Sequence, residues 1–176
     1  MEISYLADHV DYLAIIARWL HAEWGWFTPG STLESRYTAL EQHLNRDRLP
    51  LAIVAHEEGR PIGTASLRTH DMDTRQNFTP WLARVYVIPQ VRTRGRGTRL
   101  VAGIEAEAQR LGFERLYLVT FDKASYYTKR GWAELERTHY REKPVNLMHK
   151  VLLPTTTSGP FTSTPSRWRL STHAIT

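Results

Sequence analysis

The chain has 176 residues, of which 41% are hydrophobic and 23% charged, as is typical of a globular domain with a sizeable core. The absence of cysteine excludes disulfides, thiolate nucleophiles and cysteine-ligated zinc. A net charge of +5 would suit a nucleic-acid binder, but much of the positive excess is arginine near one turn, which favours a small polyanionic ligand instead.

Membrane insertion and secretion are not indicated by the sequence. No apolar run is long enough to span a bilayer, and the N-terminus lacks a basic region followed by an apolar one. We therefore expect a cytoplasmic protein without a membrane partner.

The N-terminal part predicts a strand at 2–6 and then two amphipathic helices. Apolar residues recur at helical spacing from Val10 to Trp24, with Asp8 as the expected N-cap and Gly25 as the stop. The run Ser31-Thr32-Leu33-Glu34 fits a capping box, which opens a second helix that reaches Leu44.

The middle of the chain predicts a hairpin, a loop, and a strand followed by a helix. Strands are expected at 50–55 and 62–68, joined by a turn at 57–61. A polar loop at 69–80 precedes a strand at 81–88, and an amphipathic helix at 97–111 ends at Gly112.

The last part predicts a strand at 115–120, a short helix at 123–130, a strand at 132–137, a turn at 140–144 and a final strand at 145–152. This order indicates an α/β (α+β) fold, a mixed central sheet with helices on both faces. We expect one domain at 1–152 and a flexible Ser/Thr/Pro-rich tail at 153–176.

The turn after the strand at 81–88 carries the clearest chemical signal, the pattern Arg-x-x-Gly-x-Gly from Arg92 to Gly97. A helix start offers unpaired N–H groups to an anion, and glycines let the backbone approach it closely. A Rossmann fingerprint would need glycine at Leu100, and a P-loop would need a Gly-Lys-Ser/Thr run that is absent. Both of these nucleotide-binding motifs are therefore excluded.

The segment from Val87 to Gly97, with Pro89 three residues before Arg92, resembles the acetyl-CoA-binding motif of the GNAT superfamily of N-acetyltransferases. The segment 124–132 resembles the family's Ala-x-x-aromatic-Tyr-x-x-x-Gly-aromatic motif, and the element order also matches. Within the family, the chain looks most similar to bacterial members of unassigned substrate. It departs from the family pattern at Thr93, at Asp122 and in the spacing of Ala124.

The resemblance implies that an amine attacks the thioester of acetyl-CoA directly, in a ternary complex without a metal. Tyr127 occupies the position of the acid that protonates the leaving thiolate, and Tyr126 is expected to pack on another face. His139 and His149 have no partner at ligand spacing, so no metal site is expected. The implied cofactor-binding residues are Val85, Tyr86, Val87, Arg92, Thr93, Arg94, Gly95, Arg96, Gly97, Thr98 and Asp122.

The acceptor and the general base stay open. Glu23, His70, Asp71 and Asp73 lie where family members line the acceptor site, but ordered water is an equal candidate for the base, and each of these side chains is also typical of a solvated surface. The acceptor amine is expected on an amino acid, a polyamine, an aminoglycoside or a peptide N-terminus.

Two other functional classes remain as alternatives, a non-catalytic acyl-CoA-binding or regulatory module on the same fold and a nucleic-acid binder. A single Arg-Gly-Arg-Gly run is poor support for the second, so no nucleic-acid partner is expected. An outer strand at 145–152 is a candidate for pairing between the subunits of a homodimer.

Overall fold

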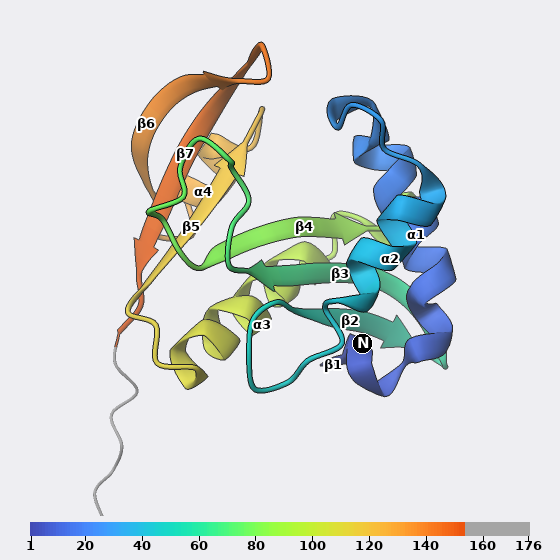
Figure 1. Cartoon of the computed structure of the whole chain (residues 1–176). Helices are drawn as coiled ribbons and strands as arrows, with labels where there is room; N and C mark the ends of the chain where they lie inside the picture. The colour runs from blue at the N-terminus through green and yellow to red at the C-terminus, as the bar shows by residue number, and fades with distance from the viewer. Residues whose placement is uncertain (154–176) are drawn as a thin grey trace, which may run out of the picture.

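The computed structural model describes residues 1–153, so the predicted tail lies outside the described residues except for its first residue. The described chain forms a mixed seven-stranded sheet in the order β1-β2-β3-β4-β5-β7-β6 (Figure 1). Its strands are β1 (Glu2–Tyr5), β2 (Leu51–Glu57), β3 (Arg60–Arg68), β4 (Trp81–Val87), β5 (Arg115–Thr120), β6 (Ala133–Tyr140) and β7 (Lys143–Val151). Its helices are α1 (Leu13–Trp24), α2 (Leu33–Glu41), α3 (Arg96–Arg110) and α4 (Ala124–Thr128).

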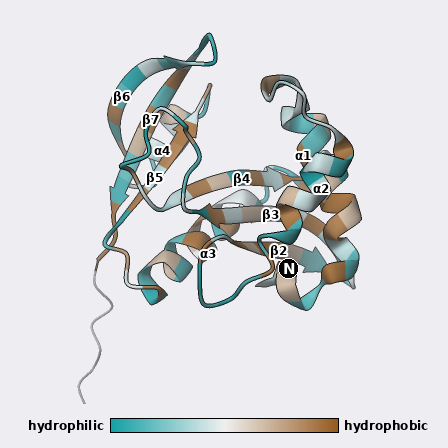
Figure 2. Ribbon diagram, viewed as in Figure 1, coloured by the Kyte–Doolittle hydropathy of each residue, from teal (hydrophilic) through white to brown (hydrophobic). Residues whose placement is uncertain are grey.

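Helices cover both faces of the sheet, which confirms the predicted class (Figure 1). On one face, Leu100 and Ile104 of α3 pack with Ile53, Leu67 and other fully or nearly fully buried strand residues. On the opposite face, α1 and α2 bury their apolar sides against Ala52 and Val54 of β2. Figure 2 shows hydrophobic residues concentrated in the central strands, and hydrophilic ones in the loops that connect them.

The sheet contains two hairpins with tight, two-residue turns. The predicted β2–β3 hairpin is confirmed, and its turn contains only Glu58 (φ 50°) and Gly59 (φ 72°). The β6–β7 hairpin turns in the same way at Arg141 (φ 48°) and Glu142 (φ 63°). Two residues with positive φ match the right-handed twist of the flanking strands, so strands β6 and β7 extend further than the predicted turn at 140–144 allows.

The last strand is not at the edge of the sheet. The expectation of an outer strand at 145–152 is wrong, because β7 pairs antiparallel with β5 from Val151 to Asn146 and with β6 on its other side. The edge strand at this end of the sheet is therefore β6.

Both predicted helix starts are displaced along the chain. Two 3₁₀ turns, Leu6–Asp8 and Val10–Tyr12, precede α1, so the helix begins at Leu13, and Asp8 forms an ion pair with Arg46 instead of capping it. The capping box of α2 joins Thr32 and Ser35, one residue later than predicted. The β-region backbone of Thr32 allows its side chain to accept the N–H of Ser35, as an N-cap requires.

The predicted polar loop between β3 and β4 has no regular structure, but it contributes to a third part of the core. Met72 is fully buried among Trp81, Tyr140, Val145 and Leu147. Helices α1 and α2 do not extend over β5 and β7 (Figure 1). The loop therefore covers this part of the sheet instead.

Strands β4 and β5 pair at only one point, Trp81 with Tyr117, and then diverge (Figure 1). Strand β4 also pairs with β3, and this pairing is interrupted by a bulge opposite the segment from Thr64 to Ser66 of β3. Arg84 lies in the bulge and has a φ of 55°. From Leu82 onward the edge of β4 that faces β5 has no partner strand within residues 1–153. The divergence opens the sheet where the functional site lies.

No helix within residues 1–153 combines the length and the apolar composition that crossing a membrane requires.

His43, two residues after the end of α2, is buried, with only 3% of its surface exposed. Its Nδ1–H donates to the carbonyl of Ala39 at 2.9 Å, and its buried Nε2 has no hydrogen-bond partner among the described residues. Burial lowers the pKa of His43 to about 3, with the nearby charges of Arg84 and Arg68 acting in the same direction. The folded protein therefore holds this side chain neutral.

The low pKa of His43 predicts a loss of stability in mild acid. The unfolded chain binds a proton below about pH 6.5, whereas the folded chain does not until about pH 3, so the free energy of unfolding should fall by about 2 kcal/mol between pH 7 and pH 5 from this residue. In urea unfolding experiments at pH 7 and pH 5, the free energy of unfolding of His43→Gln should differ between the two pH values by about 2 kcal/mol less than that of the wild type. The same change at the exposed His139 is the control, and an unaltered pH dependence in His43→Gln would contradict the assignment.

Candidate functional site

A cleft of about 760 Å³ lies between the diverging strands β4 and β5. The segment from the end of α1 to α2 and the hairpin of β6 and β7 also line it. Val85, Tyr86 and Val87 line the cleft from the unpaired edge of β4. Free backbone groups of this edge are therefore available to a ligand that adopts an extended conformation.

The glycine turn at the start of α3 lines a second cavity, of about 250 Å³, which shares Val87 and Arg92 with the large cleft. Gly95 is the N-cap of α3 at φ 71°, and no side chain caps the helix. The backbone N–H groups of 94–98 donate to no group of the described chain. Several free donors thus converge at the positive end of the helix dipole, as anion binding requires.

Thr93, the departure noted in the sequence, has a φ of 71°. A residue with a Cβ in this region costs on the order of 1 kcal/mol or more. The turn therefore keeps the conformation that glycine would adopt easily, at some cost in stability.

The arginine side chains of this turn have different environments. Arg94 is exposed, whereas Arg92 donates from Nε to the carbonyl of Val87 at 2.8 Å. The Arg96 side chain turns away to Glu57, with Nη2 and Oε1 2.7 Å apart. The part of Arg96 that remains available to an anion at the turn is its backbone N–H.

Arg130 is a residue of this region that sequence reasoning missed. It lies over the Tyr126 ring, 3.5 Å from the centroid, and its Nε donates to Thr98 Oγ1 at 3.1 Å. The Tyr126 hydroxyl lies 3.1 Å from the same Thr98 oxygen, so Tyr126 packs at the turn and not in the large cleft. The available signal was the position of Arg130 within the Tyr-x-x-x-Gly segment.

Tyr127 lines the large cleft from α4. Its ring lies edge-on to Trp132, with centroids 5.8 Å apart, and to Tyr126 at 5.1 Å. Burial raises the pKa of Tyr127, so its hydroxyl is protonated at neutral pH and can act as a proton donor.

The four side chains that the sequence suggested for the acceptor site and the general base differ in whether they line the cleft and in their ion pairs. Glu23 lines the cleft from α1 and forms no ion pair with any described residue. Asp71 also lines the cleft, but its carboxylate pairs with Arg68 at 2.5 Å. His70 and Asp73 do not line it, and Asp73 lies 3.8 Å from Arg141.

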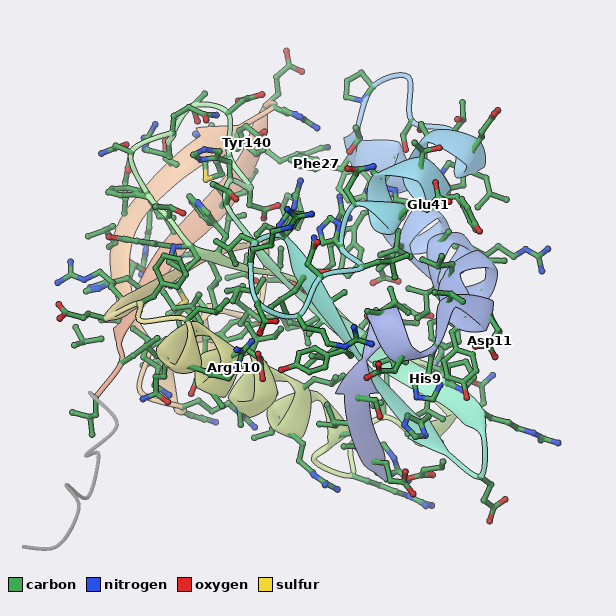
Figure 3. The ribbon with its side chains drawn as sticks, turned by 60° about the horizontal axis from the view of Figure 1, so that its bottom comes forward. His9, Asp11, Phe27, Glu41, Arg110 and Tyr140 are labelled. Carbon is green, nitrogen blue, oxygen red and sulfur yellow. The ribbon has the colours of Figure 1, made fainter. Side chains whose placement is uncertain are left out.

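An aromatic bridge closes one end of the cleft. Phe27, which follows α1, meets Tyr140 at the end of β6 with ring centroids 5.6 Å apart (Figure 3). Phe121 packs on Phe27 at 4.9 Å, and the guanidinium of Arg141 lies over the rings of Phe27 and Tyr140. Trp24, at the end of α1, also lines the cleft.

Sequence reasoning also missed three arginines of the cleft: Arg36 on α2, Arg68 at the end of β3, and Arg84 in the bulge of β4. Burial lowers the pKa of Arg36, and it lowers that of Arg84 to about 9, with Arg68 a like charge beside each of them. Both stay cationic at neutral pH. Nothing in the local sequence distinguishes these arginines from surface ones.

Residues 1–153 contain no group of three or more His, Cys, Asp or Glu side chains that could hold a metal ion.

The fold is that of several solved acetyltransferases. The structure superposes on aminoglycoside 6'-acetyltransferase type Ii with a TM-score of 0.67 and 22% identity, covering 88% of this chain and 99% of the other. An aminoglycoside 6'-N-acetyltransferase in complex with coenzyme A gives 0.63 and 21%, covering 88% and 98%. A putative acetyltransferase from Salmonella typhimurium with its cofactor acetyl-CoA gives 0.64 and 20%, covering 92% and 99%.

At the level of sequence, the chain matches no curated protein. Residues 15–132 match the family model of the acetyltransferase (GNAT) family, and this range contains the glycine turn, Tyr127 and both diverging strands. The chain therefore belongs to the GNAT family of acetyltransferases.

Proposed function

We propose that this protein is an acetyl-CoA-dependent N-acetyltransferase, which transfers the acetyl group to a primary amine of a small molecule or a peptide N-terminus in a ternary complex. One observation carries the proposal: Tyr127 and the unpaired edge of β4 line the same cleft, and that cleft adjoins the free N–H groups at the start of α3.

The donor side has the groups that coenzyme A needs. Acetyl-CoA supplies an activated acetyl group as a thioester. The free amides of 94–98 and the guanidinium of Arg130 would hold its pyrophosphate, and the backbone of Val85 to Val87 would pair with the amides of its pantetheine arm. Asp122, exposed at the end of β5, lines the same cleft.

Different groups of the cleft would stabilise charge and transfer protons at the thioester end of acetyl-CoA. A backbone N–H of β4 would lie near the thioester oxygen, where negative charge develops. The protonated hydroxyl of Tyr127 would donate to the leaving sulfur. Glu23, or water next to it, would accept a proton from the ammonium form of the acceptor.

The structural neighbours support the choice of donor. One was solved with coenzyme A and another with acetyl-CoA, and all have the same fold at about one fifth identity. The aminoglycoside acceptor in two of their names is one of several amine classes to be tested here, together with amino acids, polyamines and peptides.

The direct test is a screen of these amine classes with acetyl-CoA, read out as release of the free thiol. Turnover on at least one primary amine, with the acetyl group recovered on nitrogen by mass spectrometry, is the expected outcome. Tight coenzyme A binding without turnover on any amine would instead favour the non-catalytic module. A nucleic-acid binder would show affinity for RNA or DNA that falls steeply with salt and does not respond to acetyl-CoA.

Tyr127→Phe should lower kcat by about 100-fold or more while the Kd for coenzyme A stays within about twofold, because only the proton donor is removed. Steady-state kinetics and calorimetry measure the two quantities. Tyr117→Phe, which removes a hydroxyl from a ring stacked on Phe78, is the matched control and should retain full kcat. An active Tyr127→Phe enzyme would show that the acid is another group.

Gly97→Ala should weaken the binding of coenzyme A without changing the stability of the fold. The added Cβ would lie 3.6 Å from the Tyr126 hydroxyl and 3.9 Å from Val87 Cγ2, so the protein can accept it, but it intrudes on the small cavity. We expect the Kd for coenzyme A to rise about tenfold or more, which is about 1.4 kcal/mol, with unchanged thermal stability.

Gly59→Ala is the control for Gly97→Ala. Its φ of 72° in the β2–β3 turn strains any other residue, so this variant should lose about 1 kcal/mol of stability and keep its affinity for coenzyme A. Equal effects of the two variants on coenzyme A binding would contradict the phosphate role of the glycine turn.

A further inference from the structure

Three arginines from distant parts of the chain meet on the face of the sheet that α1 and α2 cover. Arg36 comes from α2, Arg68 from the end of β3 and Arg84 from the bulge of β4, and all three line the large cleft. The charges of Arg68 and Arg84 both act on the buried ring of His43 behind them. None of the three arginines lines the smaller cavity at the glycine turn.

The hydrogen-bonding capacity of this cluster is only partly used. Arg36 is 8% exposed, and its Nη2 donates to Ser31 Oγ at 3.2 Å, but its buried Nε has no partner among the described residues. Nη1 of Arg84 is likewise buried without a partner. Of the three, only Arg68 forms an ion pair with a carboxylate of the described residues, that of Asp71, whose charge also acts on Arg84.

The cluster therefore has an excess of positive charge in a partly desolvated place. Burial, and after it the like charge of Arg68, lowers the pKa of Arg36 and Arg84, yet both remain cationic at neutral pH. Burying a guanidinium without an opposite charge costs several kcal/mol, so a fold does not gain stability from it. A small anion that enters the cleft would supply the missing partner.

The backbone at Arg84 supports a role in binding. Its φ of 55° places a residue with a Cβ in the left-handed region in the middle of a strand, which is a local strain. A bulge redirects a side chain within a strand, and here it accompanies the placement of Arg84 in the cleft. Tyr86, on the unpaired edge, is two residues away, about 7 Å along the strand.

We propose that the acceptor is an amine that also carries a carboxylate, and that Arg36 and Arg84 bind this carboxylate. The proposal rests on the function proposed above and specifies its substrate class. A carboxylate held at Arg84 leaves an amine a few bonds away within reach of the donor end of the cleft. Polyamines and aminoglycosides, which are polycations, would meet like charge there.

The chemistry is shared by free amino acids and by peptides, which differ in the distance between amine and carboxylate. Binding of the reaction products tests the site without depending on turnover. The ligands are N-acetylglycine, N-acetylphenylalanine and N-acetylglutamate, one N-acetylated dipeptide, and the primary amide of each. Calorimetry in the presence of saturating coenzyme A gives the Kd of every acid and of its amide.

In the wild-type protein at least one acid should bind tenfold or more tightly than its amide. Preference for the single residues assigns the site to free amino acids, and preference for the dipeptide assigns it to peptides. If no acid binds more than threefold tighter than its amide, the proposal is overturned, including the case in which nothing binds.

The variants Arg84→Met and Arg36→Met should reduce the ratio of the two Kd values to about one. Both should keep or raise the thermal unfolding midpoint, because each removes an uncompensated charge. If one of them does not fold, the other still decides the question. Arg18→Met, an exposed arginine of α1 that does not line the cleft, should leave the ratio unchanged. A ratio unaltered in the folded Arg84 and Arg36 variants would overturn the proposal.

The two proposals fail in different ways. Turnover of amines with no preference for acids over amides would leave the N-acetyltransferase standing and remove the arginine site. Selective binding of acids without turnover of any amino acid or peptide would keep the carboxylate site and remove the enzymatic function.

Discussion

The single point of pairing between β4 and β5 is the constraint on which the rest of the structure depends. Parallel neighbours in a sheet normally continue to pair, but these two meet at Trp81 and Tyr117 and then separate. The buried cluster around Met72 and Trp81 holds them together at that end. The separation creates the cleft, frees one edge of β4 and places Tyr127 of α4 across from it. A continuous ladder here would leave a well-packed sheet with no site.

Local departures from ordinary protein structure gather around this opening. Helix α3 begins at a glycine in the left-handed region, Gly95, with no side-chain cap from the described residues. Thr93 and Arg84 have left-handed backbone angles outside any hairpin turn, and among the described residues the three arginines of the cluster form an ion pair only with Asp71. Such a distribution is typical of proteins in which local stability is given up where a ligand binds.

The sequence predicted most of the helices and strands, and it predicted a donor site from a local motif, because both depend on local patterns. Apolar periodicity located the strands and helices, and the spacing from Arg92 to Gly97 predicted a phosphate-binding turn, which the structure places at the start of α3. Strand order was not accessible, since the pairing of β7 between β5 and β6 depends on contacts far apart in the chain. The arginine cluster was missed for the same reason: Arg36, Arg68 and Arg84 lie on three elements, and each alone resembles a solvated side chain. Arg96, in contrast, looked like part of the site, but Glu57, far away in sequence, engages its side chain.

The unpaired edge of β4 has a consequence for solubility as well as for ligand binding. A row of free N–H and C=O groups on an apolar strand is a template on which another chain can form an intermolecular sheet, and exposed edges of this kind promote aggregation. In this fold the edge is an interior one, recessed between β5 and α1, and the aromatic bridge of Phe27 and Tyr140 narrows the approach to it. A flexible ligand can enter, whereas the edge of a second folded sheet cannot. The recessed position of this edge, together with Arg84 in the bulge of β4, can thus limit pairing with another chain while the edge stays open to a ligand.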